Sequence, residues 1–220
     1  MTKSTVAVRE LLPHVDRLII TGFSGRDVAS VQAHVDELVK EGIPAPEQVP
    51  SFYPVPLDLL TTATDIEVSS RESSGEVEPV LFFVNGERWL SIASDHTARD
   101  LERQSIQISK EACAKVIGQT AWRFDDIADR FDELQLHSEV RVDGTWQKYQ
   151  QAPASSMLPV NTILELCREA GHDTADGLAI LLGTVPLLTD GFVYGEAFRG
   201  DLNGPGGDSL RLEYNIDVRR

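Results

Sequence analysis

The chain has 220 residues, of which 41% are hydrophobic and 25% charged, as in an ordinary folded protein of one large or two small domains. A formal net charge of −15 leaves no basic surface for phosphates and disfavours anionic lipid, which argues against nucleic-acid and membrane partners. No stretch has the roughly 18 apolar residues of a membrane span, and the N-terminus has no signal-peptide core. Cys113 and Cys167 lack metal or redox spacing, so we expect reduced thiols in a cytoplasmic protein.

The first sixty residues are predicted to hold two strands and one helix. Thr5–Val8 and Arg17–Thr21 have strand character, and the second is expected to be buried because its apolar residues are consecutive. Arg26–Glu41 carries valine and leucine at helix intervals, and a glycine follows it. Pro44–Pro56 contains five prolines and is predicted to be a fixed but irregular connector.

The strongest local signal in the chain is a hairpin. Two apolar runs, Val80–Val84 and Trp89–Ala93, are separated by Asn85-Gly86. An Asn-Gly pair between such runs favours a type I′ turn, because both central residues need a positive φ angle. A two-residue loop would place Val84 opposite Glu87, so that opposed residues have numbers that sum to 171.

This register predicts that three carboxylates meet at the open end of the hairpin. Glu76 falls opposite Asp95, and Glu78 lies on the same face because side chains alternate along a strand. Like charges so close destabilise the sheet unless a cation lies between them. Mg²⁺ accepts carboxylate oxygens and keeps positions open for substrate. The alternative is a frayed strand end with three solvated acids.

The rest of the chain predicts many short strands and few helices. Ile66–Val68 is a plausible strand, and Ser69–Gly75 is predicted to be a flexible loop over the site. We expect strands at Gln135–Val142, Leu178–Leu182, Phe192–Phe198 and Leu210–Val218. A surface turn or short helix is expected at Asp125–Leu136 and a helix at Ser156–Ala170. The absence of regular βαβ alternation favours a β-rich α+β fold over a doubly wound one.

The segment SDHTARDLE (Ser94–Glu102) resembles the fumarylacetoacetate hydrolase family, whose signature there is roughly D-x-[ST]-A-R-D-[LIV]-Q. Glu102 departs from it, because the family has glutamine. The likeness extends over most of the chain. Glu76-Val-Glu78 is similar to the family's E-x-E metal pair, and Asp95 to its third carboxylate ligand. The resemblance therefore implies Mg²⁺ or Mn²⁺ as cofactor.

Further segments extend the resemblance. Lys115 falls about twenty residues after Asp95, where members carry an active-site lysine. Val142–Met157 is similar to a family segment in which Gln150 takes the glutamine position. Leu182–Pro186, which contains Gly183 and Thr184, resembles the family's T-G-T-P with one residue inserted before the proline. Phe52–Pro56 departs from the pattern, because it lacks the lysine of the family's F-x-K-P.

His34 and Glu37 resemble an H-x-x-E dyad that short members carry on a mobile segment covering the site. Three residues apart on a helix, they share a face, and a carboxylate can support an imidazole as a base. On spacing alone the pair is a surface ion pair, and within the wider resemblance it is a catalytic pair.

The resemblance implies chemistry on small 2-oxo acids. The metal would stabilise an enolate, Lys115 would place a positive charge beside the developing oxyanion, and Arg99 would hold the substrate carboxylate. Arg99 pairing structurally with Asp100 or Glu102 is an equal alternative. Gln150, Gly183 and Thr184 are expected to contact substrate.

We therefore expect a divalent-metal-dependent hydrolase of the C–C bond of an acylpyruvate-like acid. The alternatives are a decarboxylase, a hydratase or dehydratase, or an isomerase on the same scaffold, or a non-catalytic member. The implied architecture is a mixed β-sheet roll or sandwich with a few peripheral helices. It would form one domain over residues 1–220, with a lid-like helix within 1–60 and a metal-binding core at 61–220. The resemblance also implies a homodimer.

Overall fold

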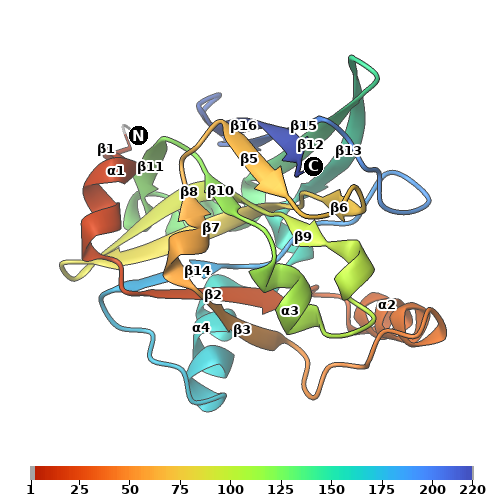
Figure 1. The fold of residues 1–220 in the computed structure, drawn as a ribbon. Helices are drawn as coiled ribbons and strands as arrows, with labels where there is room; N and C mark the ends of the chain where they lie inside the picture. Colours follow the sequence, from red (N-terminus) through yellow and green to blue (C-terminus); the bar gives the residue numbers. More distant parts are fainter. Residues whose placement is uncertain (1–2, 220) are drawn as a thin grey trace.

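A computed structural model of the chain describes residues 3–219 and has two main β-sheets that pack face to face. The larger sheet has nine strands in the order β1-β11-β8-β7-β14-β2-β3, and β10 joins β4 to β8. Figure 1 shows the second sheet, of five strands in the order β13-β12-β15-β16-β5, at the top of the view. Sheets of both parallel and antiparallel pairs with few helices confirm the β-rich α+β prediction.

The strands of the large sheet are β1 (Thr5–Ala7), β2 (Arg17–Gly22), β3 (Ser51–Val55), β4 (Leu60–Thr61), β7 (Val77–Val84), β8 (Glu87–Asp95), β10 (Lys115–Ile117), β11 (Thr120–Arg123) and β14 (Leu178–Leu181). Those of the second sheet are β5 (Asp65–Val68), β12 (Gln135–Val142), β13 (Thr145–Pro153), β15 (Ala197–Asn203) and β16 (Ser209–Val218). A short separate pair consists of β6 (Ser73–Ser74) and β9 (Thr97–Ala98).

The helices lie at the periphery. They are α1 (Val8–Leu11), α2 (Val28–Lys40), α3 (Ile106–Glu111) and α4 (Val160–Glu169), with 3-10 turns at Leu12–His14, Leu57–Leu59, Arg99–Leu101, Phe124–Asp126, Ala128–Glu133 and Ala154–Ser156. Among residues 3–219 no helix is long and apolar enough to cross a membrane.

The large sheet is buried on both faces, because its central strands alternate between two apolar clusters. Val77 and Leu81 of β7 face the second sheet and join the cluster that contains Phe198 of β15. Val80 and Phe82 face the opposite way, into a smaller cluster that α1 helps to cover. Glu78 belongs to this second face, so the predicted carboxylates lie at the end of the smaller cluster.

The β7–β8 hairpin confirms the predicted register. Val84 pairs with Glu87 and Glu78 pairs with Ala93. Asn85 and Gly86 form the turn with φ angles of 55° and 75°, as a type I′ turn requires. At the open end the Asp95 amide donates to the Glu76 carbonyl over 3.0 Å, which continues the ladder beyond the last paired strand residues.

Three local predictions were wrong. Residues 51–55 of the proline-rich connector form β3, which tolerates Pro54 because β3 is the edge strand next to β2. The predicted flexible loop ends in β6, where Ser73 and Ser74 are buried and pair with β9. The predicted strand at 192–198 begins only at Ala197, because the preceding residues form an irregular loop.

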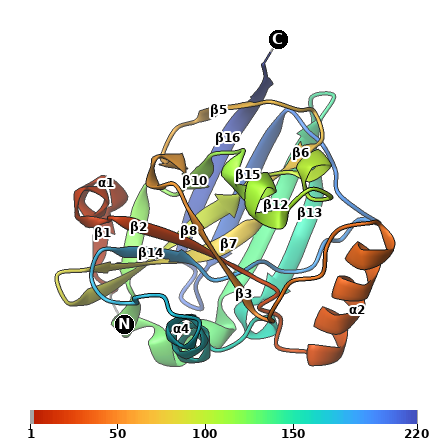
Figure 2. The same cartoon turned by 60° about the horizontal axis from the view of Figure 1, so that its bottom comes forward.

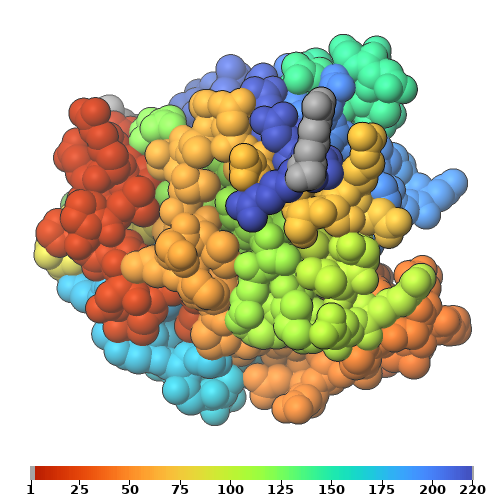
Figure 3. Space-filling view, in the orientation of Figure 1, coloured from red at the N-terminus to blue at the C-terminus, as the bar shows by residue number. Residues whose placement is uncertain are grey.

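Helix α2 is the least buried element of the N-terminal part. Figure 2 shows it at the right-hand edge of the molecule, and Val35 is its one buried side chain. In Figure 3 its surface lies directly below the segment that leads into α3, and Arg103 Nε donates to the Glu41 carbonyl over 3.1 Å.

Strands β1 to β3 belong to the same sheet as β7 and β8. The predicted division at residue 60 stays a prediction, and its outer bounds, 1 and 220, lie outside the described residues.

Candidate active site: a buried cluster of acidic and basic side chains

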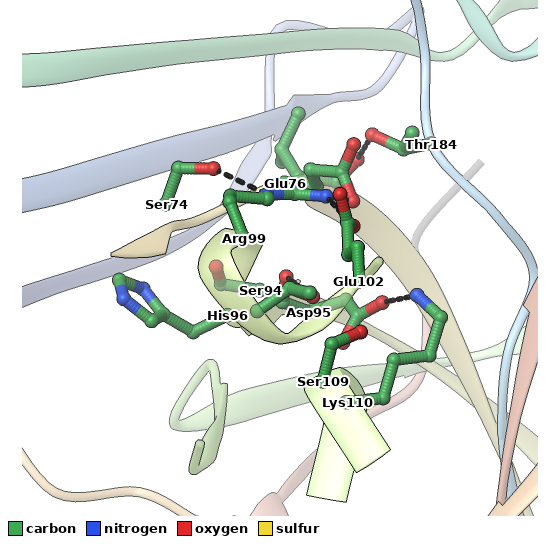
Figure 4. A network of polar contacts seen from close by, with 12 residues as sticks. Ser74, Glu76, Ser94, Asp95, His96, Arg99, Glu102, Ser109, Lys110 and Thr184 are labelled. Carbon is green, nitrogen blue, oxygen red and sulfur yellow. Dashed lines mark hydrogen bonds and ion pairs between the residues drawn. The ribbon is translucent and has the colours of Figure 1, made fainter. Parts of the chain in front are cut away.

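The predicted acids lie in a cluster that also contains three basic side chains, shown in part in Figure 4. We call this set the charged cluster and define it as Glu76, Glu78, Asp95, Arg99, Glu102, Lys110 and Lys115. Hairpin strands β7 and β8 carry Glu78 and Asp95, the turn after β9 carries Arg99 and Glu102, and α3 and β10 carry the lysines. Segments far apart in the sequence therefore meet at the open end of one hairpin.

Asp95 is held by two lysines. Lys115 Nζ lies 2.9 Å from Asp95 Oδ1, and Lys110 Nζ contacts Asp95 Oδ2. Both Asp95 and Lys115 are completely buried, and Lys115 also donates to the His96 carbonyl over 2.5 Å. Burial alone would raise the pKa of Asp95, but the two lysines outweigh it and hold that pKa well below its usual range.

The two lysines differ in their surroundings. Burial lowers the pKa of Lys115, and Asp95 only partly offsets this. Burial acts in the same direction on Lys110, but Asp95, Glu76 and Glu78 outweigh it and raise its pKa, so Lys110 stays charged. Lys110 keeps 7% of its surface exposed, whereas Lys115 keeps none. Of the two lysines, Lys110 is therefore the less completely buried.

Arg99 is fixed from four directions. Its guanidinium lies 3.0 Å from Glu76 Oε2 and 2.6 Å from Glu102 Oε1, and Nε donates to Ser74 Oγ over 2.8 Å. The ring of Phe192 stacks on it at 3.8 Å, from guanidinium carbon to ring centre. Burial alone would lower the pKa of Arg99, but the two glutamates outweigh it and raise the pKa. The pairing with Glu102 is one of the two alternatives that the sequence left open.

Glu78 is the carboxylate of the cluster that lacks a basic partner among residues 3–219. It is 2% exposed, and its Oε2 accepts a hydrogen bond from the Gly183 amide over 2.9 Å. Burial, followed by the charge of Asp95, raises its pKa well above the usual value, and Glu76 adds to this. The repulsion predicted for the three acids falls on Glu78, because Asp95 pairs with two lysines and Glu76 pairs with Arg99.

In the described part of the chain, no group of three or more His, Cys, Asp or Glu side chains is arranged to hold a metal ion. The reason lies in the basic side chains: Asp95 is turned to Lys110 and Lys115, and Glu76 is turned to Arg99. The assignment of Glu76, Glu78 and Asp95 as metal ligands stays a prediction.

Gln150 joins the two sheets through its side-chain amide. Its Oε1 accepts from the Val77 amide and from Ser138 Oγ, each over 2.9 Å. Its Nε2 donates to Thr184 Oγ1 over 2.8 Å and to the Val185 carbonyl over 2.7 Å. With four hydrogen bonds inside the protein and 1% exposure, its amide is saturated. Its predicted contact with substrate stays untested.

Gly183 and Thr184 hold the loop after β14 against the hairpin. Gly183 has a φ of +102°, and a Cβ there would lie 1.8 Å from Ser24 Oγ, so only glycine fits. Thr184 Oγ1 donates to the Val77 carbonyl over 3.0 Å. Both residues thus border Glu78, and their predicted substrate contacts stay predictions.

His34 and Glu37 lie on α2 with exposed side chains, as the surface alternative expects. The nearest aromatic neighbour of His34 is Phe23, with ring centres 6.0 Å apart. Phe23 has a φ of 58°, which is unusual for a bulky residue and marks strain at the junction of β2 with α2. Within residues 3–219 no hydrogen bond or ion pair links this pair to the charged cluster.

Lys110 is the member of the cluster that sequence reasoning missed. The available signal was the pair of lysines in SKEACAK, five residues apart, of which the resemblance singled out Lys115. A short helix followed by a strand brings both amines to the same aspartate, which residue spacing alone does not reveal.

His96 lies behind the cluster in a neutral hydrogen-bonded pocket. Nδ1 is 2.8 Å from the Tyr214 hydroxyl and Nε2 is 3.1 Å from Ser73 Oγ. Burial, followed by the charges of Lys115 and Arg99, lowers the pKa of His96 to about 3. The folded protein therefore keeps this imidazole uncharged at pH values where an unfolded histidine takes up a proton.

His96 should make the protein less stable in mild acid. Because its folded pKa is lowered, stability is present above the unfolded pKa near 6.5 and is lost as the pH falls toward 3. Between pH 6.5 and 5 this loss is about 2 kcal/mol. Glu78, whose folded pKa is raised, makes the folded protein more stable as the pH falls. The effect of His96 is therefore measured as the difference between a His96 variant and the parent. Urea unfolding at both pH values should give a smaller acid loss for His96→Gln than for the parent, and equal losses would contradict the assignment.

The fold is shared with a group of solved metabolic enzymes. The apo form of 2-keto-3-deoxy-D-arabinonate dehydratase is similar with a TM-score of 0.66 and 17% identity, over 98% of this chain and 82% of that chain. A 5-carboxymethyl-2-hydroxymuconate delta-isomerase from Mycobacterium smegmatis is similar with a TM-score of 0.63 and 19% identity, over 94% and 80%. The same dehydratase complexed with magnesium and 2,5-dioxopentanoate gives 0.65 and 17%, over 98% and 82%.

These likenesses support the fumarylacetoacetate hydrolase resemblance at the level of the fold. The chain belongs to the family described as protein of unknown function (DUF2848), whose model matches residues 21–214. None of the curated proteins matches it.

Proposed function

We propose that the protein is a divalent-metal-dependent enzyme that acts on small 2-oxo acids, with hydrolysis of a C–C bond as the preferred reaction. The single observation that carries this proposal is the buried meeting of Glu78 and Asp95 on the hairpin, with Lys110 paired to Asp95. The solved dehydratase with magnesium and 2,5-dioxopentanoate, which has the same fold, supports both the substrate class and the metal.

The three carboxylates are chemically suited to a hard divalent ion, which would have to draw two of them away from their basic partners. Glu76, Glu78 and Asp95 offer carboxylate oxygens, and Glu78 is buried without a basic partner among residues 3–219, so a divalent cation would neutralise it. Such an ion would compete with Lys110 for Asp95 and with Arg99 for Glu76. When bound, it would supply a Lewis acid for the charge that develops on the substrate.

The chain's own residues account for the remaining chemistry. Lys110, charged and less completely buried than Lys115, is suited to stabilise negative charge on a substrate oxygen, a role that the resemblance implies for Lys115. Lys115, fully buried behind Asp95, is suited to fix the orientation of that carboxylate. The His34–Glu37 pair would activate water if α2 folds over the cluster.

A second reaction class has specific support. Within residues 3–219, no hydrogen bond or ion pair joins His34 or Glu37 to the charged cluster. The solved proteins of similar fold include a dehydratase and an isomerase. Dehydration, isomerisation or decarboxylation of a 2-oxo acid needs the same stabilised enolate without an activated water from α2. His34→Ala separates the two classes, because it should abolish hydrolysis and leave the others measurable.

A screen of 2-oxo acids with and without chelator tests the proposal. We expect turnover of at least one acylpyruvate or related acid, lost in EDTA and restored by Mg²⁺. Glu78→Gln keeps the shape of the side chain and should abolish Mg²⁺ binding in calorimetry, because it removes a ligand charge. Glu133→Gln, which breaks an exposed pair with Arg130, is the control and should bind normally. Turnover that is indifferent to EDTA, or normal Mg²⁺ binding by Glu78→Gln, would contradict the metal site.

A further inference from the structure

Tyr53 lies next to the charged cluster and, unlike Asp95 and Lys115, keeps part of its side chain exposed. It lies on the edge strand β3, and its ring packs so closely on Gly22 that a Cβ there would lie 2.9 Å from Tyr53 Cε2. Gln107 of α3 donates to the Pro54 carbonyl over 2.6 Å, which ties β3 to the helix that carries Lys110. The ring therefore packs against β2, its strand is tied to α3, and the side chain remains partly exposed.

The Tyr53 ring lies close to Lys110, the residue that we propose to stabilise charge on the substrate. Lys110 Nζ lies 5.7 Å from the ring centre, within the range of a cation–π contact. Burial raises the pKa of the Tyr53 hydroxyl, and Ser51 and Lys110 oppose this only in part. Tyr53 is thus a neutral hydrogen-bond donor at physiological pH, next to a charged amine and the aspartate that holds it.

The basic side chains of the cluster are already matched by acids of the protein. Lys110 and Lys115 share Asp95, and Arg99 lies between Glu76 and Glu102. A substrate with one carboxylate can be taken up at the metal end, where a divalent ion adds positive charge. A second carboxylate at the Tyr53 end would lie by Lys110, whose charge Asp95 already neutralises, so it would be buried without a cation of its own, which is costly.

We propose that the Tyr53 hydroxyl binds the distal end of the substrate by donating a hydrogen bond to an uncharged oxygen, and that the enzyme therefore prefers 2-oxo acids with a distal hydroxyl or carbonyl to those with a second carboxylate. This inference rests on the proposed function and adds the substrate class to it. Tyr53 acts here as a specificity residue, and the reaction itself is carried by the charged cluster.

Three ligands and two variants test the inference on the full chain with Mg²⁺. Oxalate occupies only the metal end, 4-hydroxy-2-oxobutanoate adds a distal hydroxyl, and oxaloacetate adds a distal carboxylate. Thermal-shift titration should give Tyr53→Phe the parent's affinity for oxalate and an affinity for 4-hydroxy-2-oxobutanoate that is lower by about tenfold, the loss of one hydrogen bond. Tyr53→Lys should bind oxaloacetate about tenfold more tightly than the parent, because it supplies an unmatched cation.

Tyr194→Phe is the matched control, since it removes a hydroxyl from a tyrosine that is 40% exposed on the loop after β14 and should leave all three affinities unchanged. Tyr53→Phe binding all three ligands like the parent, or losing oxalate as strongly as 4-hydroxy-2-oxobutanoate, would overturn the inference. A parent protein that binds none of the three with Mg²⁺ would instead overturn the proposed function, and the inference with it.

Discussion

Asp95→Asn should lower the free energy of unfolding by about 3–5 kcal/mol, because removing one member of a buried ion pair leaves the other without a partner. Here the orphaned charges are two, on Lys110 and Lys115, and Asp95 is completely buried between them. Asparagine keeps the shape of the side chain, so the loss reports the charge. Urea denaturation at pH 7 measures it.

Asp132→Asn is the control for this prediction, because Asp132 pairs with Arg26 in an exposed position that is worth at most about 1 kcal/mol. The difference between Asp95→Asn and the parent should also depend on pH. The folded pKa of Asp95 is lowered, so its contribution is present above the unfolded pKa near 3.9 and is lost as the pH falls below it. A difference that stays constant from pH 7 to pH 3 would contradict the role of the charge.

Lys110→Met should reduce kcat by about 10²–10³-fold, the usual effect of removing one group that stabilises an oxyanion. The partner lysine still neutralises Asp95 in this variant, so the fold should remain intact. Steady-state kinetics on the best 2-oxo acid, with circular dichroism to verify folding, measures the effect.

Lys115→Met is the matched comparison, since it removes the other amine from the same aspartate. Lys115 has no exposed surface, so its loss should act through the position of Asp95 and weaken Mg²⁺ binding more than it lowers kcat at saturating metal. Equal losses of kcat at saturating Mg²⁺ in both variants would show that the two lysines do not divide their roles in this way.

The hairpin was predictable because its geometry is local. Asn85-Gly86 sets the turn, the turn sets the register, and the register brings Glu78 and Asp95 to one face. None of these steps needs information from a distant part of the chain. The same holds for β2 and β14, whose apolar runs predicted buried strands.

The basic half of the cluster was not predictable in the same way. Lys110, Lys115 and Arg99 arrive on three elements whose packing depends on tertiary contacts, such as the contact of α3 with β3. The spacing of Lys110 and Lys115 from Asp95 in the sequence does not show which of the two amines contacts the carboxylate. The saturation of Gln150 by groups of both sheets is likewise a tertiary property, as is the edge position that lets β3 contain a proline.

The paired ribbon of β7 and β8 has a consequence for how this family can vary. The position of each acidic residue is set by the number of residues between it and the Asn85-Gly86 turn, with Glu78 on the β7 arm and Asp95 on the β8 arm of the hairpin. Substitutions along the arms leave that count untouched, whereas one inserted or deleted residue on either arm turns its acids to the other side. Natural relatives that retain the acids should therefore differ freely in composition between the corner and the acids, and keep the length of both arms the same.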